Sequence, residues 1–456
     1  MKLIRILFLV LIFILFIIGM IIYKTRPQYA GTLKGLPVNE PVEVFFDDYG
    51  IPHIYAQNSH DAYVALGFVH AQERLFQMET LRRAGGGRLS EVFGEDLLKV
   101  DEFFRTMGIP EKAEMESQRS EMRSDEEYVK VAKAYLEGVN YFVKEGSAPL
   151  EFTIAGIPKV EFTIKDMHLV AGAMSYNFAL GLRTDPLMQW ILDTRGSDYL
   201  DDLLSAHNGP SETIPNWPRQ YDHPSTESST NKDADVISMI ADFPFPKLYG
   251  SNSWAVAPSR TEARAALFSN DTHIGYSQPC TWYEAHLEYP GQQLYGNFMA
   301  GIPYALTGHN SHSAWGLTML LNDDMDLYCE KLDEQGKRYL FGGQWVDLST
   351  KVDTIKVKGE DDVFLTSRST HHGPIVTRFI TTASEDDVIS MQWTFLQTKS
   401  DLMEAFFKIN TAQSMTATKE GVSLISSPGL NITYADVEGN IALWAAARLN
   451  RRPDHV

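Results

Sequence analysis

The sequence is poor in cysteine and in basic residues, and both scarcities exclude whole classes of protein. Its 456 residues include two cysteines, Cys280 and Cys329, which excludes a disulfide-dense scaffold and a cysteine-rich zinc site. One disulfide between them and two separate thiols both stay open. Lysine and arginine number 40 against 59 aspartates and glutamates, a net charge of −19. Because nucleic-acid binding needs a basic surface that displaces counterions, we expect no nucleic-acid partner.

Common nucleotide-binding and hydrolase motifs are also missing. The chain has no P-loop, GxGxxG, HExxH or GxSxG pattern, and their absence removes several common enzyme classes. Apolar residues make up 44% of the chain and charged residues 22%, the balance of a globular protein rather than a disordered one. A chain of this length buries a sizeable core and spans two or three domains as a first expectation.

One long apolar run lies near the N-terminus. Residues 6–22 are 17 consecutive apolar residues, which as a helix span roughly 26 Å, near the hydrocarbon thickness of a bilayer. Lys2 and Arg5 precede the run, as in a signal sequence, and no clean small-x-small cleavage site follows it. A buried core helix is the alternative. We predict that residues 1–30 are a membrane anchor or signal segment, with the remainder outside the cytoplasm, in the periplasm or on the cell surface.

The rest of the chain changes character along its length. Residues 31–205 are mainly helical in pattern after a short β-type stretch, and Asp61 suits the N-cap of the first helix. Residues 206–250 include a proline-containing polar tract that is typical of a spacer. Residues 251–456 are rich in β-like segments, as at 254–257, 353–357 and 388–393. We expect a helical half joined by a spacer to a β half.

The end of this spacer is a candidate for chemistry. Gly250 and Ser251 stand directly before a β-like run, and a serine in that place suggests a nucleophile exposed by self-cleavage. A free α-amino group has a pKa of about 7.7–8.0, so a chain-leading Ser251 would carry both nucleophile and base. Gly250 would permit a strained approach of the hydroxyl to the preceding carbonyl. An ordinary turn is the commoner explanation of such a pair.

Short blocks of sequence stand in order from about residue 40 to the end. They are DYGIPHI at 48–54, GFVHAQERLFQME at 67–79, GRLSE at 87–91, GSNSW at 250–254, GHN at 308–310, NDDMD at 322–326 and LNITYAD at 430–436. In these blocks and their spacing the chain resembles the penicillin acylase family of N-terminal nucleophile hydrolases. The resemblance implies an α+β fold, the four-layer αββα sandwich of those hydrolases, with an α-rich N-terminal segment.

The resemblance also implies an amidase activated by its own proteolysis. The Gly250–Ser251 bond would be cut, and the α and β chains of one precursor would stay associated. The substrate would be a small-molecule N-acyl amide of the penicillin or cephalosporin type. An acyl-homoserine-lactone acylase is the alternative within the same chemistry.

The resemblance assigns roles to five residues. Ser251 would attack the acyl carbon, with its own freed amine as base. The side-chain amide of Asn431 and the backbone N–H of Met319 would donate to the tetrahedral oxyanion. His273 would hold the Ser251 amine or hydroxyl in position, and Asn252 would assist self-cleavage. A turn or cap role for Asn431 and a structural role for His273 are the alternatives.

Five further residues align near the acyl pocket of that family. They are Ile274, Thr307, Leu317, Met174 and Phe178. Since most are apolar, simple core packing is the alternative for each.

The acidic run at 322–326 aligns with the calcium site of the family. The resemblance implies Asp323, the carbonyl of Met325 and Asp326 as Ca²⁺ ligands, with Asp185 from the helical half completing the set. Calcium prefers such a mixture of carboxylate and carbonyl oxygens. The ion would be structural and tie the two chains together. An acidic surface turn is the alternative.

The part of the chain after the spacer is shorter than in that family. Residues 251–456 number 206, whereas the relatives continue well beyond the last block. We therefore expect a sandwich incomplete at its C-terminus, with exposed sheet edges and uncovered apolar faces. A gene fragment, a split protein, a genuine short form and an inactive membrane-tethered remnant all stay open.

Overall fold

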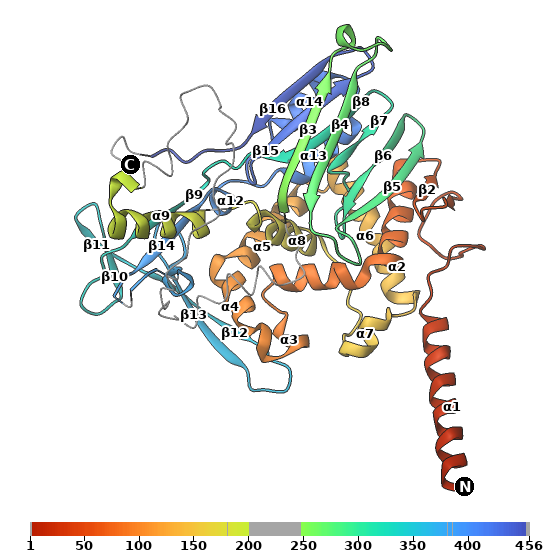
Figure 1. The fold of residues 1–456 in the computed structure, drawn as a ribbon, viewed down its shortest axis with the longest axis horizontal. Helices are drawn as coiled ribbons and strands as arrows, with labels where there is room; N and C mark the ends of the chain where they lie inside the picture. The colour runs from red at the N-terminus through yellow and green to blue at the C-terminus, as the bar shows by residue number, and fades with distance from the viewer. Residues whose placement is uncertain (1, 180, 200–247, 381, 385, 453–456) are drawn as a thin grey trace, which may run out of the picture.

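An eight-stranded sheet with helices on one face forms the body of the protein (Figure 1). The computed structural model describes residues 2–452 apart from 180, 200–247, 381 and 385. All strand pairs in this sheet are antiparallel except β2 with β5, which are parallel. In spatial order the strands are β1 (Glu43–Phe46), β2 (Pro52–Tyr55), β5 (Trp282–Tyr289), β6 (Gln292–Met299), β7 (Thr307–Asn310), β8 (Ser313–Met319), β15 (Leu430–Asp436) and β16 (Ile441–Ala446).

The helices cover the face of the sheet where the apolar side chains gather. On β5 the alternating residues Tyr283, Ala285 and Leu287 are buried under α2, as the two-residue period of a strand requires. The helices of the body include α2 (Ser59–Gly85), α3 (Ser90–Phe93), α4 (Leu98–Met107), α5 (Ile109–Met122), α6 (Glu127–Glu145), α7 (Leu150–Ala155), α8 (Ile164–Tyr176), α12 (Thr394–Gln397), α13 (Leu402–Thr411) and α14 (Met415–Val422). A further helix, α9 (Gly181–Arg195), lies away from this face, beside β9 (Met325–Cys329).

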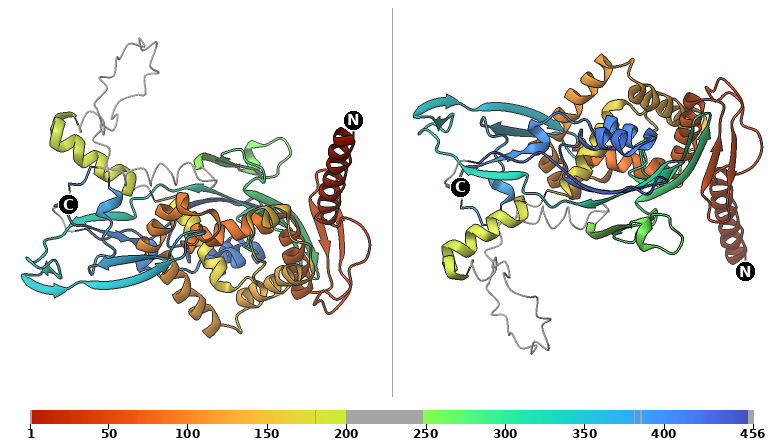
Figure 2. Two further views of the ribbon diagram at one scale, coloured as in Figure 1. Left: turned by 90° about the horizontal axis from the view of Figure 1, so that it is seen from below. Right: turned by 90° about the horizontal axis from the view of Figure 1, so that it is seen from above.

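A two-stranded ribbon stands on the opposite face of the sheet (Figure 2). It consists of β3 (Leu248–Val256) and β4 (Leu267–Ile274), and it packs over β8, β15 and β16. Asn270 of β4 donates its side-chain N–H to the carbonyl oxygen of Leu317 on β8, at 3.0 Å. A Cβ atom at Gly316 would lie 2.5 Å from the Asn270 side chain. Glycine at 316 therefore lets the ribbon lie close against the sheet.

Three smaller antiparallel pairs extend from the other end of the molecule. They are β9 (Met325–Cys329) with β14 (Ile389–Trp393), β10 (Arg338–Phe341) with β11 (Gln344–Asp347), and β12 (Ser349–Ile355) with β13 (Val363–Ser369). The β9–β14 pair lies against α9, so it joins the β half to a helix that precedes the spacer.

The predicted α+β class is confirmed, and so are the strands expected at 254–257 and 388–393. The strand expected at 353–357 is β12, which ends at residue 355. Helices, the large sheet and the ribbon make three of the four expected layers, and in the described residues no helix covers the outer side of the ribbon. Most of the predicted spacer, 206–250, lies outside the described residues. Both cysteines are free and exposed.

The predicted N-cap of the first long helix was wrong by three residues. Asn58 is the N-cap of α2, and its side chain accepts from the backbone N–H of Asp61. The Asp61 carboxylate instead accepts from the backbone N–H groups of Asn39 and Glu40, at 2.8 and 2.9 Å. A contact with a distant segment therefore takes the carboxylate away from the cap role that its local position suggested.

The apolar N-terminal run forms the helix α1 (Lys2–Lys24), which projects away from the body in Figure 1. The segment Ile4–Lys24 is long and apolar enough to cross a membrane. A cleaved signal sequence would meet the same criteria of length and composition.

Two glycines let α2 and α6 cross at short range. A Cβ at Gly67 would lie 2.0 Å from the Tyr135 carbonyl oxygen, and a Cβ at Gly138 would lie 1.9 Å from the Val64 carbonyl oxygen. Both clashes are with backbone, so neither is relieved by a side-chain rotation. The two glycines therefore allow α6 to pack closely on α2, and α2 in turn packs on β5 of the sheet.

We expect G138A to lower the free energy of unfolding by about 3 kcal/mol, because the added methyl group forces the two backbones apart. Thermal and urea unfolding measure this. The matched control is G19A in α1, where nothing lies within 4 Å of the added methyl group. Equal stability of G138A and the parent would show that the crossing is looser than the structure has it.

Candidate functional site

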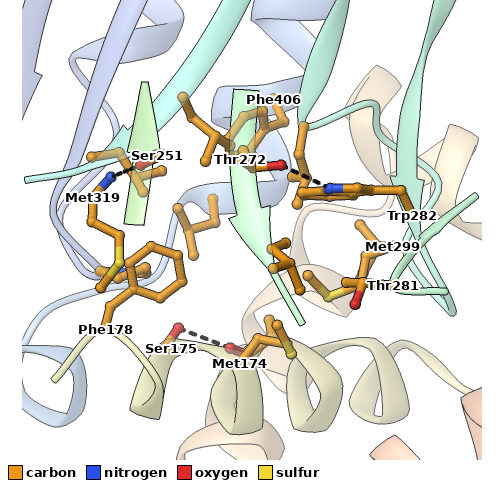
Figure 3. A pocket seen from close by; sticks show the side chains of 18 of the residues that line it. Met174, Ser175, Phe178, Ser251, Thr272, Thr281, Trp282, Met299, Met319 and Phe406 are labelled. Atoms are coloured by element: carbon orange, nitrogen blue, oxygen red, sulfur yellow. Dashed lines mark hydrogen bonds between the residues drawn. The ribbon is translucent and has the colours of Figure 1, made fainter. Parts of the chain in front are cut away.

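A largely apolar cavity lies where the ribbon, the large sheet and helices α8 and α13 meet (Figure 3). Its volume is about 100 Å³. Four of the five predicted pocket residues line it, namely Met174, Phe178, Ile274 and Leu317. Thr307 is not among the lining residues. It is buried on β7, where its hydroxyl accepts a hydrogen bond from Asn297 at 3.2 Å.

Ser251 lies at the edge of this cavity, on β3. Cross-strand pairing places it opposite Thr272 of β4, so both side chains share one face of the ribbon and both line the cavity. The backbone N–H of Met319 donates to the Ser251 hydroxyl at 3.3 Å. The predicted nucleophile and one predicted oxyanion donor therefore meet, although they are 68 residues apart in the chain.

Asn431 lies next to the same point, on the neighbouring strand β15. Register pairs Asn431 with Thr318 of β8, so its side chain lies on the face of the sheet that the ribbon covers. Its amide donates to the Met319 carbonyl oxygen at 3.1 Å and to the Thr318 hydroxyl at 3.2 Å. For Asn431 to donate to a bound oxyanion, it would exchange one of these partners.

His273 and Asn252 come together on the other face of the ribbon. The pairs Gly250 with His273 and Asn252 with Asp271 alternate with the Ser251 pair, so these side chains point away from the Ser251 hydroxyl. His273 Nε2 lies 3.1 Å from a carboxylate oxygen of Asp271 and 3.3 Å from the amide nitrogen of Asn252. One ring nitrogen either donates to the first or accepts from the second.

The histidine lies against the predicted scissile junction. A Cβ at Gly250 would be 3.6 Å from His273 Nδ1, so the ring lies beside the backbone of residue 250. Gly250 itself is in an ordinary strand conformation and is not among the residues with positive φ. The backbone at Gly250 therefore shows no left-handed conformation, and the predicted strained approach of the Ser251 hydroxyl stays a prediction.

Three neighbours of the site were missed from sequence. Thr272 lies opposite Ser251, Trp282 donates its ring N–H to the Thr272 hydroxyl at 2.9 Å, and Asn270 anchors the ribbon. The sequence signal that could have found Thr272 and Asn270 is the pairing of β3 with β4. That pairing predicts which side chains share a face only when the length of the turn between the strands is known, because a register shift of one residue moves every side chain to the opposite face.

The predicted calcium ligands converge, but a cation of the protein already lies among them. The Nη2 atom of Arg452 is 2.8 Å from Asp323 Oδ2 and 2.7 Å from Asp326 Oδ1. Asn450 donates to the other oxygen of Asp326 at 2.7 Å. Burial chiefly raises the pKa of Asp185, and the negative charges of Asp323 and Asp326 raise that pKa further.

As arranged, these residues do not fit a calcium ion. Calcium takes six to eight oxygen ligands, and both oxygens of Asp326 are engaged by protein donors. Within the described part of the chain, no three His, Cys, Asp or Glu side chains are placed to hold a metal ion.

Comparison with known proteins gives several similar acylases. Acyl-homoserine lactone acylase QuiP of Pseudomonas aeruginosa is 28% identical over 445 residues, covering 92% of this chain and 51% of the relative. Penicillin acylase 2 proenzyme of Pseudomonas sp. strain SE83 is 28% identical over 442 residues, covering 94% and 55%. Penicillin G acylase of Escherichia coli is 25% identical over 465 residues, covering 88% and 53%.

This chain spans about half the length of the curated relatives that it matches. The sequence model of the family described as penicillin amidase matches residues 41–456, which covers the sheet, the ribbon and every residue of the site above. The chain therefore belongs to the penicillin amidase family.

Proposed function

We propose that this protein hydrolyses the linear amide of small N-acyl compounds through an acyl-enzyme on Ser251. The observation that carries the proposal is the hydrogen bond from the Met319 N–H to the Ser251 hydroxyl, at the edge of an apolar cavity. A nucleophile, an amide donor and a space for an acyl group are the three parts that acyl transfer needs. The names of the relatives, which are acylases, support the same reaction.

The proposed reaction begins with scission of the Gly250–Ser251 peptide bond. The freed α-amino group of Ser251 then accepts the proton of its own hydroxyl, and the oxygen attacks the acyl carbon. Met319 N–H and, after exchanging a partner, Asn431 donate to the oxyanion. The amine product leaves with a proton, and water hydrolyses the ester to release the acid. The word proenzyme in the name of one relative supports a cleaved precursor.

The cavity favours a neutral acyl group. None of the described residues that line it carries a charge, and its polar groups are hydroxyls such as those of Ser175, Thr272 and Thr281. A substrate carboxylate buried among these side chains would have no cationic partner. Its desolvation would cost on the order of several kcal/mol of binding free energy. Aliphatic and aromatic acyl amides, including those of homoserine lactone and penicillin, are therefore better substrates in this proposal than dicarboxylic ones.

We expect S251A to abolish both self-cleavage and turnover, because it removes the oxygen that attacks in each step. Intact mass spectrometry and N-terminal sequencing of the folded parent should find a chain that begins Ser-Asn-Ser-Trp. The control is S253A, two residues along β3, where the hydroxyl donates to the Ser269 carbonyl at 3.2 Å. An uncleaved but active parent would refute the mechanism. A cleaved parent with no acylation burst would instead indicate a remnant that binds without turnover.

Trp282 should set the acyl length, because it lies across the cavity from Ser251 in Figure 3. We expect W282A to shift the preference in kcat/KM toward longer acyl chains, because the space that the indole leaves can bury additional methylene groups. Each buried methylene contributes ~0.8 kcal/mol, which corresponds to about a fourfold gain in kcat/KM. A series of straight-chain acyl amides, with phenylacetyl and glutaryl amides beside them, measures this. The control W254A removes a half-exposed tryptophan from the ribbon and should leave the preference unchanged. An unchanged preference in W282A would place the acyl group elsewhere.

We also propose that α1 anchors the protein with its body outside the cytoplasm. Residues 6–22 of the helix are all apolar, and none of its membrane-length apolar window is buried inside the structure. Protease added to intact spheroplasts should digest the body while the membrane fraction retains α1. Protection of the body would refute this orientation, and recovery of the whole chain from the soluble fraction would refute the anchor.

A further inference from the structure

We propose that the Arg452 guanidinium replaces a divalent cation in the acidic cluster of Asp185, Asp323 and Asp326. Its Nε donates to Oδ1 of Asp326 at 2.8 Å, and its Nη2 forms an ion pair with the same oxygen at 2.7 Å. The same Nη2 reaches Asp323 Oδ2 at 2.8 Å. One guanidinium thus bridges two carboxylates.

The bonds to Asp326 leave too few oxygens for a calcium ion. Asn450 donates to the second oxygen of Asp326 at 2.7 Å, so this carboxylate has no oxygen without a protein donor. The Met325 carbonyl and Asp185 lie near each other across Gly181, where a Cβ would be 2.9 Å from the former and 3.4 Å from the latter. Two such oxygens and one from Asp323 are half of the smallest calcium shell.

The guanidinium holds together segments that are distant in sequence. Asp323 and Asp326 flank the start of β9, Asp185 lies on α9, and Arg452 follows β16. Asp326 and Arg452 are partly buried, with side-chain exposures of 17% and 28%, so their attraction is screened less than that of a surface pair. Within the described part of the chain, Arg452 is the cationic side chain that pairs with Asp323 and Asp326. Without it, the carboxylates of Asp185, Asp323 and Asp326 would repel one another.

The test is the calcium dependence of the melting temperature of the full chain, followed by intrinsic tryptophan fluorescence. We expect the parent to melt at the same temperature in EDTA and in millimolar CaCl₂. R452Q should melt about 2 °C or more lower in EDTA and should recover in CaCl₂, because the freed carboxylate oxygens then bind the ion. Isothermal titration with CaCl₂ alone should detect binding to R452Q and none to the parent.

The matched control is R451Q, which removes the same charge from the neighbouring, exposed residue and should respond to neither reagent. R452K keeps the charge and should gain no calcium response. If R452Q does not fold in EDTA, its folding in CaCl₂ is the supporting result. A parent that loses stability in EDTA and regains it in CaCl₂ would overturn the proposal and support the family's calcium site. An R452Q that binds no calcium would also overturn it.

Discussion

The arrangement of the site depends on how closely the β3–β4 ribbon packs on the large sheet. Asn270 reaches the Leu317 carbonyl oxygen, and glycine at 316 leaves room for the Asn270 side chain. This contact brings the Ser251 hydroxyl to the Met319 N–H at 3.3 Å. Hydrogen bonds weaken steeply beyond that distance, so a ribbon displaced by about 1 Å would separate the nucleophile from the donor. Gly316, which takes no part in the proposed reaction, therefore helps to fix the distance between the Ser251 hydroxyl and the Met319 N–H.

The two halves of the chain share one core. Met174 and Phe178 come from the helical half, whereas Ile274 and Leu317 come from the β half, and all four line one cavity. Strands β1 and β2, which precede the spacer, belong to the same sheet as β5 to β8, β15 and β16, which follow it. A cut at residue 250 would thus leave the halves joined by a strand pair and a common apolar interior, because neither half can bury its apolar face alone.

Several features could be predicted because neighbouring residues decide them. The strands at 254–257 and 388–393 follow from β-type composition, and the apolar run at 6–22 gives α1. The N-cap at Asp61 failed for a different reason. Its carboxylate is taken by Asn39 and Glu40, and local preference yields when a distant segment offers two backbone N–H groups. Thr307 does not line the apolar cavity, and its hydroxyl instead accepts a hydrogen bond from Asn297 on the neighbouring strand.

The sequence by itself determined the family, the order of helical and β regions, and the identity of the residues that could react. Only the tertiary structure decided which of them meet. It placed the Met319 N–H beside Ser251 and Asn431 beside Met319. It also turned His273 to the other side of the ribbon and set Arg452 among the predicted calcium ligands. Strand register and long-range ion pairs make these choices, and both join residues too far apart in the chain for any local pattern to relate them.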